Sequence, residues 1–550
     1  MKKKARLLGK QISSVFLIAL LVASLTGCAN SNSNSTEGSK TSQSTKSAQS
    51  TETAKSTNAA QSTETAKTKT GGTFTYGRPA SVTSFDLDKE ITSNNAFAID
   101  KVFEPLVSFN SKGEITDWLA KSHSISADGL TYTFILRDGL KFSNGKSVTA
   151  ADAVFSIQRH QNTKDTPLPI SASIDSITAA DNQTLVIKLK AAYTPFLSEL
   201  ANFSNGIIPK DFGGVTEEAF FKKPVGTGPF VVDTWDPAGD LTFTKNTYYW
   251  QTGKPYIDKL VYKLISDDNQ AINQLKAGQV DAIESVSLGN AKELEKGTDT
   301  TIATNGSWVV EQLFFNTLDE HFSDVHVRRA LALALDRKGL TNALTFGYAK
   351  VANSLLPPTI TYNTSDTIKA LDYNVQSAKA ELAKSKFPTG FTTKLLIASG
   401  DNTRAQEAQI IQEAAKSIGI NMEIESVEVA SFRERFFAYN FSAMINSGQA
   451  DFPDADSILA FQTDPDGFSK SYWTHYKNDD VTKLLHDGQK TADGAQRADD
   501  YAKLQQILAD EVPYIPLYDS DVIVGVRKNV NGLVVLPNGS IRVEGVSLTK

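Results

Sequence analysis

Residues 139–147 come closest in this sequence to a nucleotide-binding motif. They read Gly-Leu-Lys-Phe-Ser-Asn-Gly-Lys-Ser, which resembles a phosphate-binding loop but places one residue too many between the two glycines. Such a loop also joins a strand to the start of a helix, where backbone N–H groups face the phosphates. The flanking residues here predict a hairpin instead, with turn signals at Asp138-Gly139 and Asn144-Gly145. We therefore interpret the segment as a turn between strands.

Metal-binding and nucleophilic side chains are scattered along the chain. The histidines are His123, His160, His321, His326, His475 and His486. None of them lies in a His-Glu-x-x-His motif, and the spacing of His321 and His326 places them on different faces of a helix. No Gly-x-Ser-x-Gly motif presents a nucleophilic serine. The sequence therefore predicts neither an enzyme nor a bound metal or cofactor, and a surface hydrolase is the least favoured class.

The carboxylates of Asp451, Asp454 and Asp456 could suggest a hydrolase or a calcium loop. Carboxylates at short spacing serve hydrolases as acid and base, and they serve calcium loops as ligands. This cluster lacks the glycine and the closing glutamate of the calcium-loop spacing. No catalytic constellation is recognisable, which favours a binding protein over an enzyme.

The one cysteine of the chain, Cys28, follows an export signal. Cations stand at positions 2, 3, 4, 6 and 10, an apolar run covers residues 15–23, and Leu25-Thr26-Gly27 precede the cysteine. This order predicts a cleaved secretory signal over residues 1–27, because the apolar run is shorter than the roughly 20 residues of a spanning helix. Residues 25–28 also resemble the lipobox of bacterial lipoproteins, which implies that the thiol of Cys28 receives a diacylglycerol. The alternative is an ordinary signal peptide with a chance cysteine.

Residues 28–70 predict a lipidated cysteine followed by a disordered tether. After Cys28 they are almost all Ser, Thr, Asn, Gln, Ala, Lys and Glu, and the sequence of residues 48–55 recurs at 60–67. A stretch without aromatic or large aliphatic residues cannot bury enough apolar surface to offset its chain entropy. We therefore interpret it as a flexible spacer between a lipid anchor and a globular body.

The net charge argues against two kinds of partner. The formal charge is -6, and removal of the signal with its five cations leaves -11 (-6 minus 5). An acidic surface argues against nucleic acid and against a broad footprint on an anionic membrane. We find no second membrane segment.

Strands and helices alternate beyond residue 70, which predicts a mixed α/β fold. Residues 73–76, 131–136 and 259–265 have the pattern of strands. Residues 149–152 predict a capping box that opens a helix. Residues 267–277 predict a helix ended by Gly278 and followed by a strand at 280–283, which makes a short β-α-β unit. Residues 404–418 carry one apolar helical face, ended by Gly419.

Several motifs distributed over residues 71–550 support a family resemblance. They are residues 119–122 (LAKS), 128–139 (DGLTYTFILRDG), 142–152 (FSNGKSVTAAD), 224–230 (PVGTGPF), 327–331 with 336–337 (VRRAL, DR) and 512–517 (VPYIPL). Together they resemble the extracellular solute-binding proteins of family 5, the peptide- and nickel-binding group that serves ABC importers. Most of these motifs have a structural interpretation: Gly226, Gly228 and Pro229 shape a turn, and Arg328 and Arg329 open a helix.

The resemblance implies a hinge-closing, type II periplasmic-binding-protein-like fold with two lobes joined by two crossing segments. Lobe one is expected at residues 71–108, 223–308 and 521–550, with an extra subdomain at 109–222. Lobe two is expected at residues 309–520. In this family the ligand lies between the lobes, and the lobes close around it.

The resemblance also implies a ligand site. In peptide-binding members an aspartate in an Ala-Asp-Tyr pattern takes the α-ammonium of the peptide, and Ala450-Asp451-Phe452 matches that pattern. A buried ammonium needs a buried anion to offset its lost hydration. The preceding backbone is expected to pair with the peptide main chain like an added strand, which gives broad specificity. The implied contacts are Ser447, Gly448, Gln449, Ala450 and Asp451. The alternative is that Asp451 caps a turn in the loop 451–454.

Two departures from the family pattern bear on the ligand. Family members often carry tryptophan at the position of Gly448, so that wall of the site is open or differently built here. Dipeptide binders carry an arginine for the ligand carboxylate where Ala398 aligns, which argues against a strict dipeptide binder and allows tripeptides and longer peptides. Arg404 lies close by and either starts the helix or contacts the ligand. Ser93 is a further candidate contact.

The expected function is that of a substrate-binding lipoprotein of an ABC importer that captures short peptides. Its expected partners are short peptides, the ABC permease and ATPase subunits, and the membrane through Cys28, with no nucleic acid and as a monomer. It is expected at the extracytoplasmic face of the cell membrane, and the long tether favours a Gram-positive cell. The same fold with nickel chelate, haem or a sugar as ligand remains open, as does a peptide-sensing surface lipoprotein.

Overall fold

The computed structural model describes residues 70–549, apart from positions 90, 91, 165, 167, 285 and 467–473. The predicted signal peptide, Cys28 and the tether up to residue 69 lie outside the described residues. None of the helices in this part of the chain combines the length and the apolar character that a membrane crossing needs.

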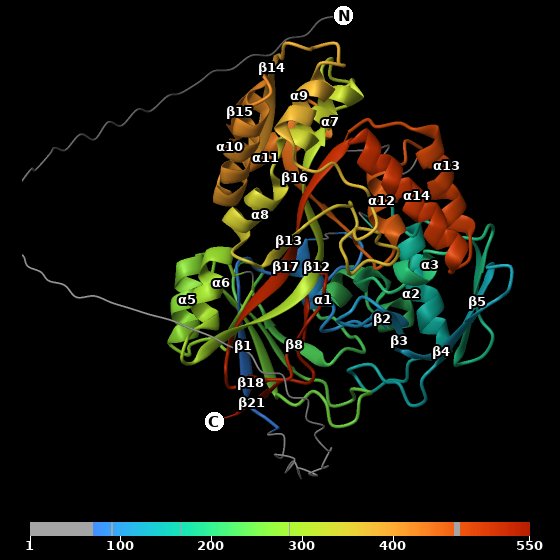
Figure 1. The fold of residues 1–550 in the computed structure, drawn as a ribbon. Helices are drawn as coiled ribbons and strands as arrows, with labels where there is room; N and C mark the ends of the chain where they lie inside the picture. Colours follow the sequence, from blue (N-terminus) through green and yellow to red (C-terminus); the bar gives the residue numbers. More distant parts are fainter. Residues whose placement is uncertain are drawn as a thin grey trace, which may run out of the picture. The chain divides into compact units, whose positions relative to one another are not determined.

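One eleven-stranded sheet organises the described chain (Figure 1). Its strands are β1 (Thr73–Arg78), β8 (Phe230–Trp235), β9 (Leu241–Lys245), β10 (Lys259–Leu264), β11 (Ala282–Ile283), β12 (Thr300–Phe315), β13 (Ala349–Val351), β14 (Thr392–Ala398), β15 (Asn421–Val427), β16 (Ala443–Gln449) and β17 (Tyr514–Arg527). They pair in the order β15-β14-β16-β12-β17-β11-β1-β10-β9-β8, and β13 pairs with β17 outside this path. Strands far apart in sequence therefore share one sheet.

The long strands β12 and β17 connect two parts of this sheet. Residues 300–306 of β12 pair with residues 521–527 of β17, and this half of β17 also pairs with β11. The other half of β12 pairs with β16. The register between β12 and β17 shifts between Gly306 and Val310, and such an irregularity bends a strand pair. The expected lobe boundaries at 308 and 520 lie beside this irregularity.

Smaller sheets accompany the large one. Their strands are β2 (Val107–Phe109), β3 (Ile115–Asp117), β4 (Ala120–Ile125), β5 (Thr131–Leu136), β6 (Ile174–Ala179), β7 (Thr184–Leu189), β18 (Val530–Asn531), β19 (Val534–Val535), β20 (Ile541–Arg542) and β21 (Ser547–Leu548). β4, β5, β7 and β6 form an antiparallel sheet in that order. The other strands form the pairs β2-β3, β18-β21 and β19-β20.

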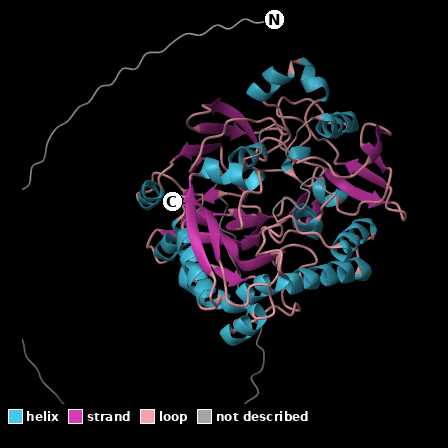
Figure 2. Cartoon of the chain, turned by 90° about the horizontal axis from the view of Figure 1, so that it is seen from above, coloured by secondary structure: helices cyan, strands magenta, loops and turns pink. Residues whose placement is uncertain are grey.

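Helices flank the strands, as Figure 2 shows. They are α1 (Ser93–Ile99), α2 (Ala150–Asn162), α3 (Phe196–Glu199), α4 (Glu217–Lys222), α5 (Asp268–Lys276), α6 (Leu288–Glu295), α7 (Val325–Ala334), α8 (Arg337–Thr345), α9 (Val375–Leu382), α10 (Asn402–Lys416), α11 (Val429–Phe437), α12 (Ala455–Thr463), α13 (Asp479–Lys490) and α14 (Ala495–Glu511), with short 3-10 helices at Phe203–Asn205 and Lys210–Gly214. α2 packs on β6 and β7, and α10 packs on β14 and β15. The mixed α/β class predicted from the sequence is confirmed.

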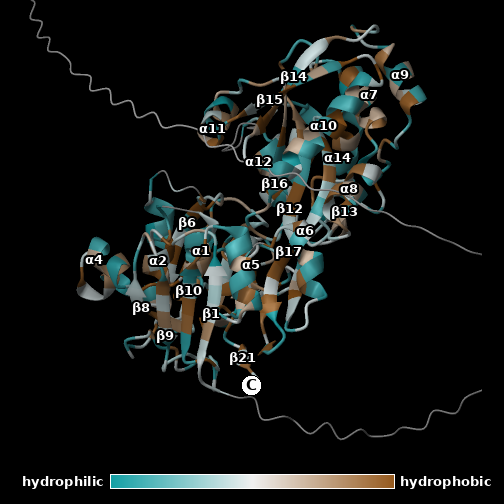
Figure 3. Cartoon of the chain, turned by 90° about the vertical axis from the view of Figure 1, so that its left-hand side faces the viewer, coloured by the Kyte–Doolittle hydropathy of each residue, from teal (hydrophilic) through white to brown (hydrophobic). Residues whose placement is uncertain are grey.

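Apolar side chains of the strands form the core. Figure 3 shows hydrophobic stretches in strands such as β10, among helices with hydrophilic faces. Phe74, Phe243 and Leu260 are fully buried in one cluster around β1, β9 and β10. Phe315 and Leu395 are buried in another cluster around β12 and β14. Burial of such side chains stabilises the fold by about 1.5–3 kcal/mol each.

Most of the elements that local sequence signals predicted lie at their predicted positions. β5 covers residues 131–136 as predicted, and the capping box is confirmed because the backbone N–H of Thr149 donates to Asp152 at 2.8 Å. The predicted helix at 267–277 is α5, which Asp267 caps. Residues 139–147 are a turn, closed by a bridge between Lys141 and Ser147.

Three local predictions need correction. The strand expected at 280–283 covers only β11, and α7 begins at Val325, before the two arginines that were expected to open it. Arg328 instead donates to the carbonyl oxygens of Glu511 and Val512 at the end of α14. Glycine is needed at position 226 mainly because the backbone packs closely there: a Cβ at Gly226 would lie 2.0 Å from the carbonyl oxygen of Val102.

Candidate functional site

Strand β16 carries an open edge beside the predicted ligand contacts. One edge pairs with β12 along its length, from Ala443 opposite Phe315 to Gln449 opposite Val309. The other edge pairs with β14 only at Ala443 and Met444. Among the described residues no strand pairs with that edge from 445 to 449. Backbone groups at such an edge can pair with another extended chain.

Two adjoining cavities lie at the end of this edge. The larger has a volume of about 470 Å³, and the smaller has a volume of about 340 Å³. They share the lining residues Leu168, Asn202, Asp451 and Phe461. We call the two cavities together the cleft, and their size is that of a typical site for a small ligand.

Asp451 lies where the two cavities meet. Its side chain is exposed to the cleft. Within the described part of the chain no group donates a hydrogen bond to its carboxylate or pairs with it; only its backbone is engaged, by Ser457 and Asn202. The surrounding protein displaces water from this carboxylate and raises its pKa to about 6. An unpaired carboxylate in a partly dehydrated cleft is suited to a cationic ligand group.

Contacts with α12 and α14 fix the loop that carries Asp451. The backbone N–H of Asp451 donates to the hydroxyl of Ser457 at 2.7 Å. Asp454 caps α12 and accepts two hydrogen bonds of 2.8 Å from the guanidinium of Arg497, whose side chain is 1% exposed. Asp454, rather than Asp451, therefore has the capping role in this loop.

Two more acids face the larger cavity. Glu199 is buried, and this burial raises the pKa of its carboxyl to about 8. Burial and the charge of Asp454 raise the pKa of Asp456 to about 6. The hydroxyl of Tyr193 lies between the two carboxyl groups, at 2.8 Å from Asp456 and 3.4 Å from Glu199.

The other predicted contacts are divided between the cleft and its wall. Ser93, Ser447, Gln449 and Ala450 line the smaller cavity. Gly448 faces the wall, because a Cβ there would lie 2.6 Å from the side-chain nitrogen atoms of both Gln312 and Gln462. These amides occupy the space next to Gly448, so the wall is differently built rather than open.

Arg404 does not line either cavity. It lies in the first turn of α10, and its guanidinium pairs with Glu311 at 2.7 Å and donates to the hydroxyl of Ser447 at 2.7 Å. The side chain thus connects α10 to β12 and β16. Its expected role as a ligand contact stays a prediction.

Contacts across the cleft involve residues that sequence reasoning missed. Asn202 donates to the backbone oxygen of Asp451 at 3.1 Å, and Tyr193 donates to Asp456. The backbone N–H of Thr194 donates to the backbone oxygen of Gln489 at 2.7 Å. No motif marks these positions, since their partners lie hundreds of residues away in sequence. A buried acid such as Glu199 leaves no local signal either.

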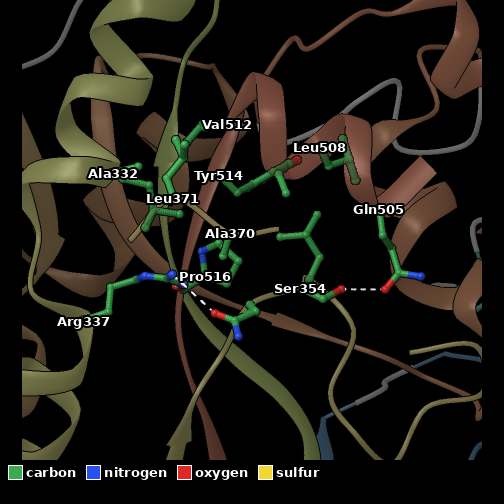
Figure 4. Close-up of a pocket in the computed structure, with 14 residues that line it drawn as sticks. Ala332, Arg337, Ser354, Ala370, Leu371, Gln505, Leu508, Val512, Tyr514 and Pro516 are labelled. Atoms are coloured by element: carbon green, nitrogen blue, oxygen red, sulfur yellow. Dashed lines mark hydrogen bonds between the residues drawn. The ribbon is translucent and has the colours of Figure 1, made fainter. Parts of the chain in front are cut away.

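A separate cavity within the second half of the chain is a weak candidate (Figure 4). Its volume is about 40 Å³, near that of a single water molecule. The polar groups that line it already have partners: Ser354 donates to Gln505 at 2.8 Å, and Arg337 donates to the backbone oxygen of Pro516 at 3.2 Å. The cavity is too small for a peptide or a cofactor. Among the described residues no three His, Cys, Asp or Glu side chains lie together as a metal ion would need.

Comparisons with known proteins agree with this architecture. The profile of the bacterial extracellular solute-binding proteins, family 5 (middle), matches residues 114–470. The chain is 27% identical over 461 residues to the glutathione-binding protein GsiB of Escherichia coli (strain K12), a match that covers 81% of this chain and 88% of that protein.

Solved structures extend the comparison to the fold. The ABC transporter-associated periplasmic binding protein DppA of Helicobacter pylori, in complex with the peptide STSA, is 27% identical with a TM-score of 0.75, over 88% of this chain and 99% of that chain. The oligopeptide-binding protein AppA of Bacillus subtilis, in complex with a nonapeptide, is 26% identical with a TM-score of 0.73, over 88% and 100%. The fold is therefore the two-lobed α/β fold of periplasmic peptide-binding proteins. The chain belongs to family 5 of the bacterial extracellular solute-binding proteins, which serve ABC transporters.

Proposed function

We propose that this chain captures short peptides outside the cell and delivers them to an ABC importer. The observation that carries the proposal is the carboxylate of Asp451, which lies in the cleft beside the open edge of β16. Among the described residues it has neither a hydrogen-bond donor nor a cation as partner. The α-ammonium of a peptide supplies both.

The peptide main chain pairs with β16 at residues 447–449. Its N–H and C=O groups meet the unpaired edge of the strand, as in strand addition, so this part of the affinity is common to peptides of different sequence. Ser447, Gln449 and Ala450 then line the path of the main chain, and Ser93 faces it from α1. This arrangement places the ammonium at the end of the strand, next to Asp451.

The lining of the cleft favours peptides longer than two residues. Among the described residues no lysine or arginine lines either cavity. A dipeptide would place its carboxylate inside the cleft without a cation, and an unpaired buried charge is costly. In a longer peptide the carboxylate lies farther from Asp451, where water can solvate it.

Ligand capture uses closure of the two lobes about the irregular region of β12 and β17. We assign lobe one to residues 71–108, 223–308 and 521–550, its extra subdomain to 109–222, and lobe two to 309–520. Residues such as Tyr193 and Asn202 on one side and Asp456 on the other then approach each other only when the lobes close. A peptide that contacts both sides favours the closed state.

Export and anchoring complete the proposal. The signal over residues 1–27 is removed, Cys28 receives a lipid, and the tether holds a monomeric body near the permease at the outer face of the membrane. A flexible tether with a polar composition lets the body reach the permease without a fixed orientation.

Glutathione is a second candidate ligand, because curated relatives are named for it. It combines an ammonium with two carboxylates and so carries a net negative charge at neutral pH. The acidic lining of the cleft, with Asp451, Asp456 and Asp464, repels the additional carboxylate. The structure therefore favours a peptide without acidic groups near its N-terminus.

A ligand panel tests the proposal by calorimetry on the mature chain. The panel contains dialanine, trialanine, pentaalanine, N-acetyltrialanine, glutathione, haem, a nickel–histidine chelate and a disaccharide. Trialanine or pentaalanine should bind at least about tenfold more tightly than every non-peptide ligand, a difference of roughly 1.4 kcal/mol. Tighter binding of glutathione, haem, the chelate or the sugar would contradict the proposal.

A further inference from the structure

The larger cavity extends beyond Asp451 into a region lined by further acids. Glu199 of α3 enters from one side, and Asp456 of α12 and Asp464, at the C-terminal end of α12, enter from the other. Asp464 pairs with His486 at 3.0 Å. Neither Glu199 nor Asp456 forms an ion pair with a described cation. Attraction between a cation and the ionised carboxylate of Asp456 is therefore stronger here than in water, since protein displaces solvent from it. A cation beside Glu199 lowers the raised pKa of that carboxyl and favours its ionised form.

A second, independent observation at this cavity is an unsatisfied acceptor. Asn205 lines the cavity and is 4% exposed. Its side-chain nitrogen donates to the backbone oxygen of Glu199 at 2.9 Å, which fixes the orientation of the amide. The side-chain oxygen then has no hydrogen-bond partner in the structure. An unpaired buried acceptor costs free energy, and a ligand that donates a hydrogen bond removes this cost.

His160 does not provide a free cation for these acids. It lines the same cavity, but its ring is buried and paired with the carboxylate of Asp88. The region thus offers several hydrogen-bond acceptors, and the described lysines and arginines do not line it. A ligand group that donates several hydrogen bonds and carries positive charge is the matching chemistry.

The competing explanation is purely structural. Glu199 accepts the backbone N–H of Ser171 at 3.2 Å, and Asp456 accepts Tyr193 and Gln489. These contacts hold the two sides of the cavity together without any ligand. They leave unexplained why the cavity is about 470 Å³ and why the oxygen of Asn205 is unpaired. A lysine or arginine side chain fits in this volume.

We propose that this acidic region is a subsite for a cationic side chain, so that the preferred ligands are peptides with lysine or arginine close to the N-terminus. The proposal rests on the proposed function, because it places the main-chain ammonium at Asp451. The cationic side chain enters the larger cavity from there and reaches Glu199, Asp456 and the oxygen of Asn205. Arginine and lysine both supply several N–H donors.

Calorimetry with matched peptides tests this subsite on the mature chain. The peptides are trialanine and three matched pairs, one pair for each position of trialanine. In each pair the alanine at that position is replaced by lysine in one peptide and by norleucine in the other. Norleucine keeps most of the aliphatic length of lysine without its charge. At one or more of the three positions, the lysine peptide should bind at least tenfold more tightly than its norleucine partner. Affinity for trialanine measures the main-chain site separately.

A double variant locates the effect. Glu199→Gln with Asp456→Asn keeps the size of both side chains and should reduce the ratio of lysine-peptide to norleucine-peptide affinity to below threefold. Because Asp456 also accepts hydrogen bonds across the cavity, this ratio is the readout: a change in lobe closure affects both peptides alike and leaves the ratio unchanged. The control double variant Glu218→Gln with Asp480→Asn makes the same two types of substitution at exposed positions and should keep the full preference. Thermal melting verifies that both variants fold.

Two results would contradict the subsite, and a third would contradict the proposed function as well. Equal affinity of lysine and norleucine peptides for wild type, or a lysine preference that survives in the Glu199 and Asp456 double variant, removes the subsite but leaves peptide binding intact. Failure of trialanine and of every other peptide to bind removes the proposed function itself.

Discussion

Replacement of Asp451 with asparagine is the sharpest perturbation of the proposed ligand site. The change keeps the size of the side chain and removes its charge. Loss of one partner from a buried charge pair typically costs about 2–5 kcal/mol. The side chain of Asp451 is exposed in the structure, so we expect the lower part of this range, about 2–3 kcal/mol. That is a loss of about 30- to 150-fold in affinity at roughly 1.4 kcal/mol per tenfold.

Acetylation of the peptide provides the matched control. Calorimetry compares trialanine and N-acetyltrialanine on wild type and on the Asp451→Asn variant. The acetylated peptide has no ammonium, so it should bind wild type weakly. Its affinity for the variant should be less than threefold lower than its affinity for wild type. An equal loss for both peptides, or no loss for either, would refute the role of Asp451.

The same variant should not harm stability. The protein raises the pKa of Asp451 from the ordinary value of 3.8 to about 6, which means that the folded state holds the proton more tightly than the unfolded state. The ionised group therefore opposes folding increasingly as the pH rises through this window and does so fully above it. Without ligand, Asp451→Asn should melt at the same temperature as wild type or higher at pH 7. A lower melting temperature would show that the carboxylate has a structural partner.

Affinity should also depend on pH in a defined direction. An ammonium favours the ionised carboxylate, so trialanine should bind fully above about pH 7 and more weakly as the pH falls through about 6. Asp456 and Glu199 are present in both proteins, so the ratio of wild-type to variant affinity isolates Asp451. This ratio should decrease toward pH 5.

Further predictions concern stability and anchoring. Arg497→Met removes one partner of a buried ion pair and should lower the free energy of unfolding by about 3–5 kcal/mol in chemical denaturation, whereas Lys483→Met, in an exposed pair, should change it by less than about 1 kcal/mol; similar values for both would contradict the structural role of Arg497. Cys28→Ala should abolish incorporation of radiolabelled palmitate, and residual labelling would exclude Cys28 as the lipidated residue. Deletion of residues 30–70 should leave the melting temperature and peptide affinity nearly unchanged, and a drop of several degrees would show that the segment packs on the body.

Local signals made much of the fold predictable. The alternating residues 131–136 and the capping box at Thr149 specify their structures through neighbouring residues alone, and both are confirmed. The hairpin interpretation of residues 139–147 rested on glycines at turn positions, and Gly139 and Gly145 indeed have positive φ angles of 72° and 84°. Such features need no knowledge of distant partners.

Sequence reasoning identified only some of the residues that line the cleft. Asp451 was identified through the family pattern, and in the structure it lines the cleft; its role as a ligand contact stays a prediction. Glu199, Asn205 and Tyr193 could not be identified, because their importance comes from lining one cavity with residues such as Asp456, more than two hundred positions away. Tertiary packing, rather than any local motif, brings these acids together around one cavity.

Native mass spectrometry of the mature chain purified from cells tests the central claim most directly. The account predicts bound masses that dissociate as peptides of three or more residues with free N-termini. Loss of these masses in Asp451→Asn would connect them to the cleft. Bound glutathione, haem, metal chelate or sugar in place of peptides would contradict the account.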